Sequence, residues 1–232
     1  MTTSAPKRRN PAGRPKAATT RWRDALPSRE ELQKLKKAAL IREAGRAFKT
    51  KGFHQTSLDD VAEALNVTKA ALYYYVKGKR ELLFETQMLA MDMGDQALQA
   101  GEHGKCGLEK FVLAMTEYIV NSSEGYGSHS VWAHMDDMLP EHSEIIRKRQ
   151  RAFDLKVRSY VDEGIRDGSI RTCDPKLAVS WVMGAINWIP RWYKDGSAYG
   201  AEEIAKNFID FLVSGLATTQ GVAATKNSLT RR

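Results

Sequence analysis

Four neighbouring residues, Lys69, Ala70, Tyr73 and Tyr74, have the types and spacing needed to contact a nucleic acid. Lysine and tyrosine side chains reach phosphate oxygens and base edges, and alanine allows a helix to approach DNA closely. In a helix, the apolar Leu72 would face inward and leave these four side chains outward. The pattern therefore predicts a short helix that enters the major groove of double-stranded DNA.

The stretch around this helix, residues 57–81, is typical of two short helices joined by a tight turn. Ser57, followed by Asp60 three residues later, predicts a capping box at the start of the first helix. Asn66 tolerates the left-handed backbone found at helix ends, and Thr68 can cap the next helix at once. The turn is then about three residues long, which is the length found in a helix-turn-helix motif.

The run VAEALNVTKAALYYYVKGKRELL, residues 61–83, resembles the DNA-binding signature of the TetR family of bacterial transcriptional regulators. The matching positions extend from about Ile41 to Phe84. Val76 stands where an aromatic residue is common, and Gly78 replaces a polar helix cap. The resemblance implies a homodimeric DNA-binding regulator whose last two helices pair with those of a second subunit, and hence a palindromic operator. The predicted DNA contacts are Thr56, Ser57, Thr68, Lys69, Ala70, Tyr73, Tyr74 and Lys79, together with Arg14 in the N-terminal tail.

The charge distribution supports a polyanionic partner for one end of the chain. The net charge of +8 is uneven. Residues 1–80 carry 19 Lys and Arg against 7 Asp and Glu, and residues 81–232 carry 17 against 21. A basic N-terminal region on a mildly acidic remainder indicates nucleic-acid binding by the first part only. In the basic tail, Gly13-Arg14-Pro15 resembles the core of a minor-groove hook. The alternative, which we favour for so short a match, is a solvated tail that adds only electrostatic attraction.

Helical periodicity without strand alternation predicts an all-α fold of about nine helices. We expect a disordered basic tail at 1–27, a helix-turn-helix DNA-binding domain at 28–80, a helical ligand-binding and dimerisation domain at 81–216, and a disordered tail at 217–232. In the second domain, Asp174-Pro175 predicts a helix start and Ala201–Leu216 the last helix.

Methionine and aromatic side chains at helical spacing in the larger domain have two interpretations, a packed core or an adaptable apolar cavity. The segment GAINWIPRWYKDG, residues 184–196, resembles regulators of fatty-acid, steroid or acyl-coenzyme A catabolism, which implies an apolar or acyl-CoA effector. In that interpretation Arg191 meets the coenzyme A phosphates; in the alternative it packs at the dimer interface. The candidate cavity residues are Met88, Phe111, Met115, Tyr118, Trp132, Met135, Met138, Trp181, Trp188 and Arg191.

The residues exclude several other kinds of protein. No apolar run approaches the about 18–20 residues needed to cross a bilayer and no signal peptide opens the chain, so we expect a cytoplasmic protein without a membrane partner. Cys106 and Cys173 imply no disulfide framework. The histidines and aspartates His129, His134, His142, Asp136 and Asp137 match no established metal-ligand spacing, so we expect neither a metal site nor a cofactor.

Three functions remain compatible with these observations. The first is a regulator, most simply a repressor, released from DNA by a small effector. The second is an acyl-CoA-binding or esterase-like helical enzyme with a basic tail, but no nucleophile motif or phosphate-binding glycine loop supports it. The third is a DNA-binding regulator that responds to no ligand.

Overall fold

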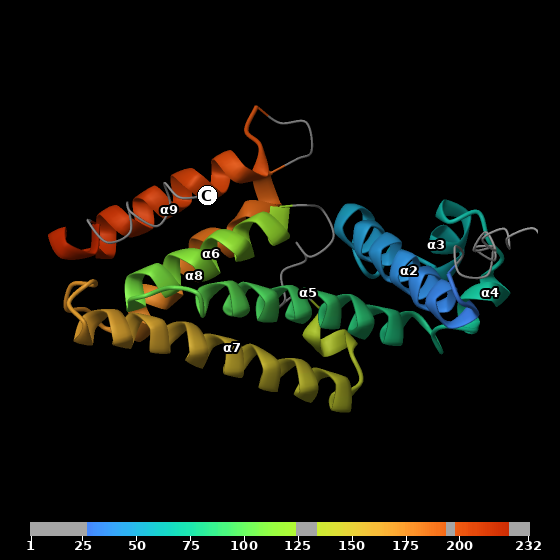
Figure 1. Cartoon of the computed structure of the whole chain (residues 1–232). Helices are drawn as coiled ribbons and strands as arrows, with labels where there is room; N and C mark the ends of the chain where they lie inside the picture. Colours follow the sequence, from blue (N-terminus) through green and yellow to red (C-terminus); the bar gives the residue numbers. More distant parts are fainter. Residues whose placement is uncertain (1–26, 124–133, 194–197, 223–232) are drawn as a thin grey trace, which may run out of the picture. The chain divides into compact units, whose positions relative to one another are not determined.

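The computed structural model describes residues 27–123, 134–193 and 198–222, and these ranges are helical, with only an isolated β-bridge (Figure 1). The all-α fold predicted from the sequence is confirmed. The helices are α2 (Arg29–Lys51), α3 (Leu58–Ala64), α4 (Lys69–Tyr73), α5 (Lys79–Gly101), α6 (Gly107–Ser123), the 3-10 turn η1 (Met135–Asp137), α7 (Pro140–Arg166), α8 (Pro175–Trp192) and α9 (Ala201–Leu216). None of the described helices is long and apolar enough to cross a membrane.

By its internal contacts the chain divides into residues 1–36 and residues 37–232. The described part of the first unit is the beginning of α2. The Ser28 N–H donates to Glu31 Oε2 at 2.6 Å, and the Glu31 N–H donates to Ser28 Oγ at 3.1 Å. This reciprocal pair forms a capping box and satisfies two backbone donors at the helix start. The second unit contains residues 37–80, called the head below, and residues 81–222, called the body.

Helix boundaries in the head follow the local signals in the sequence. Ser57 Oγ accepts the Asp60 N–H at 3.1 Å, while Asp60 Oδ2 accepts the Ser57 N–H at 2.7 Å, which is the predicted capping box. Asn66 has a φ of 53°, the left-handed conformation expected at this turn. Thr68 Oγ1 then accepts a backbone N–H in the first turn of α4. The helix-turn-helix geometry therefore depends on four side chains close together in sequence.

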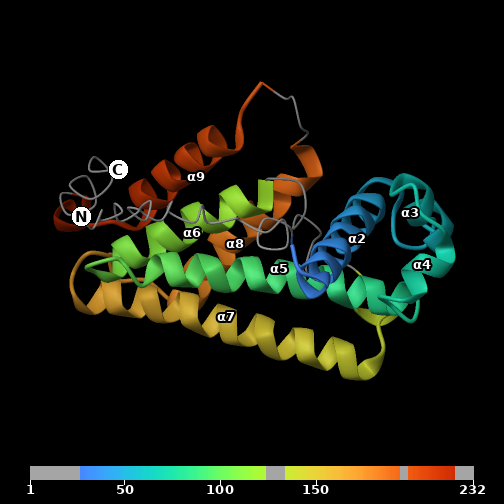
Figure 2. The same ribbon diagram turned by 45° about the vertical axis from the view of Figure 1, so that its right-hand side comes forward.

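Two hydrophobic clusters hold the second unit together. The larger lies among α6, α7, α8 and α9 with the end of α5, and includes the fully buried Phe111 and Tyr160. The smaller cluster fills the head, but three residues of the body also belong to it: Met91 of α5, Met138 just after η1, and Ile146 of α7. The packing therefore continues across the predicted domain boundary at residue 80. Figures 1 and 2 show α5 running from the head alongside α6 and α7 of the body.

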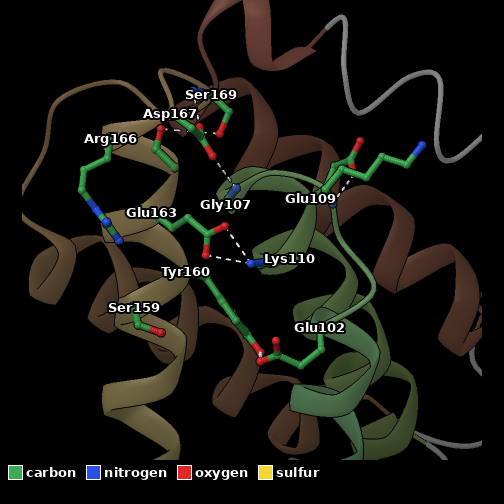
Figure 3. Close-up of polar contacts among 12 residues, drawn as sticks. Glu102, Gly107, Glu109, Lys110, Ser159, Tyr160, Glu163, Arg166, Asp167 and Ser169 are labelled. Carbon is green, nitrogen blue, oxygen red and sulfur yellow. Dashed lines mark hydrogen bonds and ion pairs between the residues drawn. The ribbon is translucent and has the colours of Figure 1, made fainter.

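Polar contacts fasten the start of α6 to the end of α7 (Figure 3). The Gly107 N–H donates to Asp167 Oδ2 at 2.8 Å, and Lys110 Nζ lies 2.7 and 2.8 Å from the two carboxylate oxygens of Glu163. A Cβ at Gly107 would overlap the backbone of Gly164, so only glycine permits this close approach. These contacts hold α6 against α7 at the end of the body that is distant from the head.

The beginning of the C-terminal segment differs from the expected disorder. Ala217 forms an antiparallel bridge with Ile170, and Thr218 Oγ1 donates to the Gly168 carbonyl oxygen at 2.6 Å. These contacts satisfy backbone groups in the turn between α7 and α8, which a composition of small polar residues does not reveal. The prediction of disorder for residues 217–232 is therefore wrong for 217–222, and residues 223–232 lie outside the described ranges.

Candidate nucleic-acid interface and effector cavity

Helix α4 presents a polar and aromatic face to solvent. Lys69 and Ala70 are exposed, and Tyr73 and Tyr74 are 52% and 68% exposed. Leu72 is 2% exposed and anchors the helix in the head cluster. Exposed tyrosines are unusual for a helix that serves only packing, because more than half of the surface of each residue remains in water. The four residues predicted to face DNA are therefore accessible on one short helix.

Lys69 is engaged in an ion pair with the preceding helix. Its Nζ lies 2.7 Å from Asp59 Oδ2, and this hydrogen bond raises the pKa of Lys69 above its ordinary value. Both side chains are exposed, so water screens the pair and separating it costs little. A phosphate or a base edge could therefore replace Asp59 as the partner of Lys69.

Thr56 does not lie on the accessible surface. It is 2% exposed, and its hydroxyl donates to the carbonyl oxygens of Gly52 at 2.8 Å and Ala47 at 3.2 Å. The predicted DNA contact by the Thr56 side chain is therefore wrong, because the hydroxyl closes the end of α2. Ser57 is exposed, but its hydroxyl is used in the capping box of α3.

Lys79, another predicted DNA contact, interacts with the loop between α2 and α3. Its Nζ donates to the His54 carbonyl oxygen at 3.2 Å and lies 4.4 Å from the ring centroid of Phe53. Thr68 caps α4, so its hydroxyl also has an intramolecular partner. Arg14 lies outside the described residues.

A cavity of about 380 Å³ opens among α5, α6, α7 and α8 of the body. This volume is within the range of small-ligand sites. Its apolar wall includes Met91, Phe153 and Met183, and the Tyr118 and Phe153 rings lie 5.3 Å apart. The complete lining is Met91, Gly94, Asp95, Tyr118, Arg147, Arg149, Gln150, Arg151, Phe153, Asp154, Arg158, Met183 and Asn187.

Four arginines of α7 line the cavity and outnumber the two aspartates, Asp95 and Asp154, that line it as well. Arg149 binds Asp92 at 2.9 Å and also pairs with Asp95, so its charge is compensated. Arg158 Nη2 lies 2.6 Å from Asp154, whereas its buried Nε has no partner among the described residues. Arg147 and Arg151 are exposed and form no salt bridge within the described ranges. The cavity therefore combines an apolar interior with cations that have capacity for an anion.

Tyr118 supplies a neutral polar group inside the same cavity. The phenol is neutral at physiological pH, and burial raises its pKa further, to about 12. Its hydroxyl donates to Asn187 Oδ1 at a long 3.5 Å. A weak contact of this length leaves both groups able to bond a ligand instead.

Most of the residues predicted to line a cavity lie elsewhere. Tyr118 does line it, but Phe111 and Met115 are 0% exposed and fill the larger cluster. Met138 is buried in the head cluster, against which Met88 and Met135 also pack. Trp181 borders a smaller apolar hollow between α8 and α9, and Trp188 and Arg191 are exposed on α8 with the guanidinium 5.6 Å from the Trp188 ring. Trp132 lies outside the described residues.

The arginine side of the cavity was missed although the sequence carries a signal for it. Arg147, Arg151, Asp154 and Arg158 recur at intervals of three and four, which places them on one face of a helix. A charged face is normally solvated, so this spacing alone did not distinguish a cavity wall from a surface.

Helices α8 and α9 expose a stripe of large apolar side chains. Leu177, Trp181, Trp188 and Trp192 follow one another at intervals of four and seven along α8 and are between 43% and 67% exposed. Phe211 of α9 is 66% exposed. Monomeric proteins rarely expose continuous apolar surface of this kind, because its burial in an interface is favourable.

A helix-turn-helix with an accessible second helix, joined by a continuous helix to a larger helical body, defines a DNA-binding transcriptional regulator. The family model of bacterial regulatory proteins of the tetR family matches residues 40–86, and that of the tetracyclin repressor-like C-terminal domain matches residues 105–216. The chain belongs to the TetR family.

Characterised and solved relatives cover most of the chain. It is 26% identical to the HTH-type transcriptional repressor KstR2 of Mycolicibacterium smegmatis over 192 residues, 78% of this chain and 91% of that protein. The crystal structure of the TetR family regulator PfmR from Thermus thermophilus is 27% identical with a TM-score of 0.70, covering 77% of this chain and 99% of that one. AibR, in complex with isovaleryl coenzyme A and operator DNA, has the same fold at 22% identity, with a TM-score of 0.68 and coverage of 76% and 97%.

Proposed function

We propose that this protein is a homodimeric transcriptional repressor that leaves a palindromic operator when an apolar, acyl-CoA-type effector occupies the body. The observation that carries the proposal is the cavity among α5 to α8, whose apolar wall faces arginines of α7. An acyl chain would lie against Met91, Phe153 and Met183. The phosphates of coenzyme A would lie at the cavity mouth, where arginine binds phosphate through paired hydrogen bonds.

The path from cavity to head runs through α5 and α7. Met91 lines the cavity and also belongs to the head cluster, and Ile146 of that cluster directly precedes Arg147 of the cavity. A ligand that moves either helix therefore changes packing around the head. It shifts the equilibrium only by its difference in affinity between the two arrangements, so the effector must bind the non-DNA-binding arrangement more tightly.

The exposed stripe on α8, together with Phe211 of α9, supports a dimer. A second copy of the same chain would cover these side chains with its own α8 and α9, as the family resemblance implies. The two copies of α4 would then be related by a two-fold axis, which requires an operator with matching symmetry.

Two relatives are consistent with this function. KstR2 of Mycolicibacterium smegmatis is named a transcriptional repressor. AibR, whose fold is similar, binds isovaleryl coenzyme A and operator DNA in its crystal structure.

The test has two stages, both with the purified full-length chain. DNA retained by the protein from a random pool is sequenced, and its affinity is measured by fluorescence anisotropy. Acyl-CoAs of increasing chain length are then added, with free coenzyme A and the free acids as controls. We expect release by one chain-length class and by neither control.

Single-residue variants test whether release by acyl-CoA depends on the cavity. Arg158→Ala should raise the acyl-CoA concentration needed for release while leaving operator affinity unchanged, because it removes a cation from the cavity. Arg166→Ala, an exposed arginine of the same helix outside the cavity lining, is the matched control. A palindromic operator that no acyl-CoA releases would favour a regulator without this ligand class, and failure to select any DNA would overturn the proposal.

A further inference from the structure

Two histidines and one aspartate converge where the loop of residues 52–57 meets η1. His54 Nε2 lies 3.3 Å from Asp137 Oδ2, and His134 Nδ1 lies 3.0 Å from the same oxygen. One ligand atom of each residue lies within 4.8 Å of the other two. No other three His, Cys, Asp or Glu side chains converge in this way within the described ranges.

We infer that His54, His134 and Asp137 form a zinc site that joins the head to the body. Two imidazoles and one carboxylate are a ligand set that zinc uses where a fourth position remains for water. Bond lengths of about 2.0–2.2 Å in a tetrahedral site place neighbouring donor atoms about 3.4 Å apart. The separations of 3.0 and 3.3 Å are already close to this value, and the third pair, one nitrogen from each histidine, lies within 4.8 Å.

The surroundings hold the three ligands near this geometry. The buried Phe53 ring packs against the His54 ring at 5.4 Å and the His134 ring at 5.3 Å between centroids. His134 has a φ of 64°, a left-handed conformation that a non-glycine residue adopts at an energetic cost. This conformation directs its imidazole to Asp137. Lys79 donates to the His54 carbonyl oxygen at 3.2 Å and lies 4.4 Å from the Phe53 ring centroid, which ties the His54 loop to the start of α5.

The position of the site gives it a function separate from that of the effector cavity. His54 belongs to the loop that leads into α3, whereas His134 and Asp137 lie at the two ends of η1, which comes before α7. A bound zinc ion would therefore hold the helix-turn-helix in its present position against the body. By linkage, zinc that binds this arrangement preferentially would stabilise it by an amount that grows with the logarithm of the free zinc concentration above the dissociation constant.

Zinc binding is measured on chelator-treated protein by equilibrium dialysis in the absence of DNA. We expect one zinc ion per wild-type chain. His54→Ala should abolish this binding, as should His134→Asn, in which asparagine removes the ligand but tolerates the left-handed backbone. His103→Ala, an exposed histidine after the far end of α5, should retain the ion. Retention of zinc by both ligand variants would overturn the inference, as would its absence from the wild type.

Spectroscopy and stability distinguish this site from chance binding to a thiol. The cobalt-substituted protein should give the visible absorption of a tetrahedral nitrogen and oxygen site, and the Cys106→Ser, Cys173→Ser double variant should give the same spectrum. Zinc should raise the thermal midpoint of wild type but not of His54→Ala. A thiolate charge-transfer band would overturn the inference.

This result is independent of the proposed repressor function. A protein that binds its operator and releases it with an acyl-CoA, but takes up no zinc, contradicts only the zinc site. A protein that takes up zinc at these residues but selects no DNA contradicts only the repressor.

Discussion

The Nζ atom of Lys69 lies 2.7 Å from Oδ2 of Asp59, so the lysine that α4 offers to DNA is held by a carboxylate of α3. The contact joins the two helices of the motif across their short turn. Asp59 therefore competes with DNA for the ammonium group of Lys69. Operator affinity should therefore depend on both residues in opposite directions.

Lys69→Ala should weaken operator binding and Asp59→Ala should strengthen it several-fold. If Lys69 contacts a phosphate, the slope of log K against the logarithm of the salt concentration should be smaller in magnitude by about 0.9 in Lys69→Ala. If it contacts a base, the loss should be about 1–3 kcal/mol for one sequence only. Anisotropy titrations at several salt concentrations separate these cases.

Glu63→Ala removes another exposed carboxylate of α3 and is the matched control for Asp59→Ala. The double variant of Asp59 and Lys69 should bind like Lys69→Ala alone, because the competitor has lost its partner. Wild-type affinity in Lys69→Ala would contradict the assignment of this residue to the DNA surface.

Thr56→Val should lower the free energy of unfolding by about 1–3 kcal/mol, since it removes a buried hydroxyl that donates to two carbonyl oxygens. Operator affinity should change little at temperatures where the variant is folded. Chemical denaturation and anisotropy measure the two quantities. Ser57→Ala, which removes a helix cap, provides a comparison at about 0.5–2 kcal/mol. Lost DNA affinity with unchanged stability would return Thr56 to the interface.

Phe211→Glu should convert the dimer to monomers by placing a charge in the apolar surface of α8 and α9. Burying such a ring contributes about 1.5–3 kcal/mol, and each ring occurs twice in a two-fold interface. Light scattering after size-exclusion chromatography measures the mass. Leu155→Glu, which alters a 53% exposed apolar residue on α7, should leave the dimer intact. A monomeric wild type would remove the basis of this prediction.

Acid should destabilise the contact between Asp167 and the start of α6. Burial opposes the charged form of Asp167, but hydrogen bonds from Gly107 and Ser169 outweigh it and lower its pKa. The folded pKa lies below the unfolded value of about 3.9, so the contribution is present above that value and is lost as the pH falls through the folded pKa.

Asp167→Asn should therefore reduce stability at neutral pH and flatten the decline of stability in acid. Urea unfolding at a series of pH values measures the slope. The exposed Glu202→Gln on α9 is the control. An unchanged acid slope in Asp167→Asn would assign the decline to other carboxyl groups.

The sequence by itself determined the elements whose signals are local. The Ser57–Asp60 capping box, the left-handed Asn66 and the cap at Asp174 each depend on side chains within about three residues of the backbone they stabilise. The last helix, Ala201–Leu216, also begins and ends as predicted. Because these signals need no distant partner, the helix-turn-helix and the all-α fold could be predicted from the chain's local patterns alone.

Only the tertiary structure decided which side chains meet across distant helices. Periodicity identifies the inward face of a helix, but it does not say whether a neighbouring helix packs tightly there or leaves space. Phe111 was therefore predicted in a cavity that Arg158 lines instead. His54 and Asp137 are 83 positions apart, and no spacing rule connects them. Their convergence depends on how α5 and α7 pack, which is determined by the whole core rather than by any one segment.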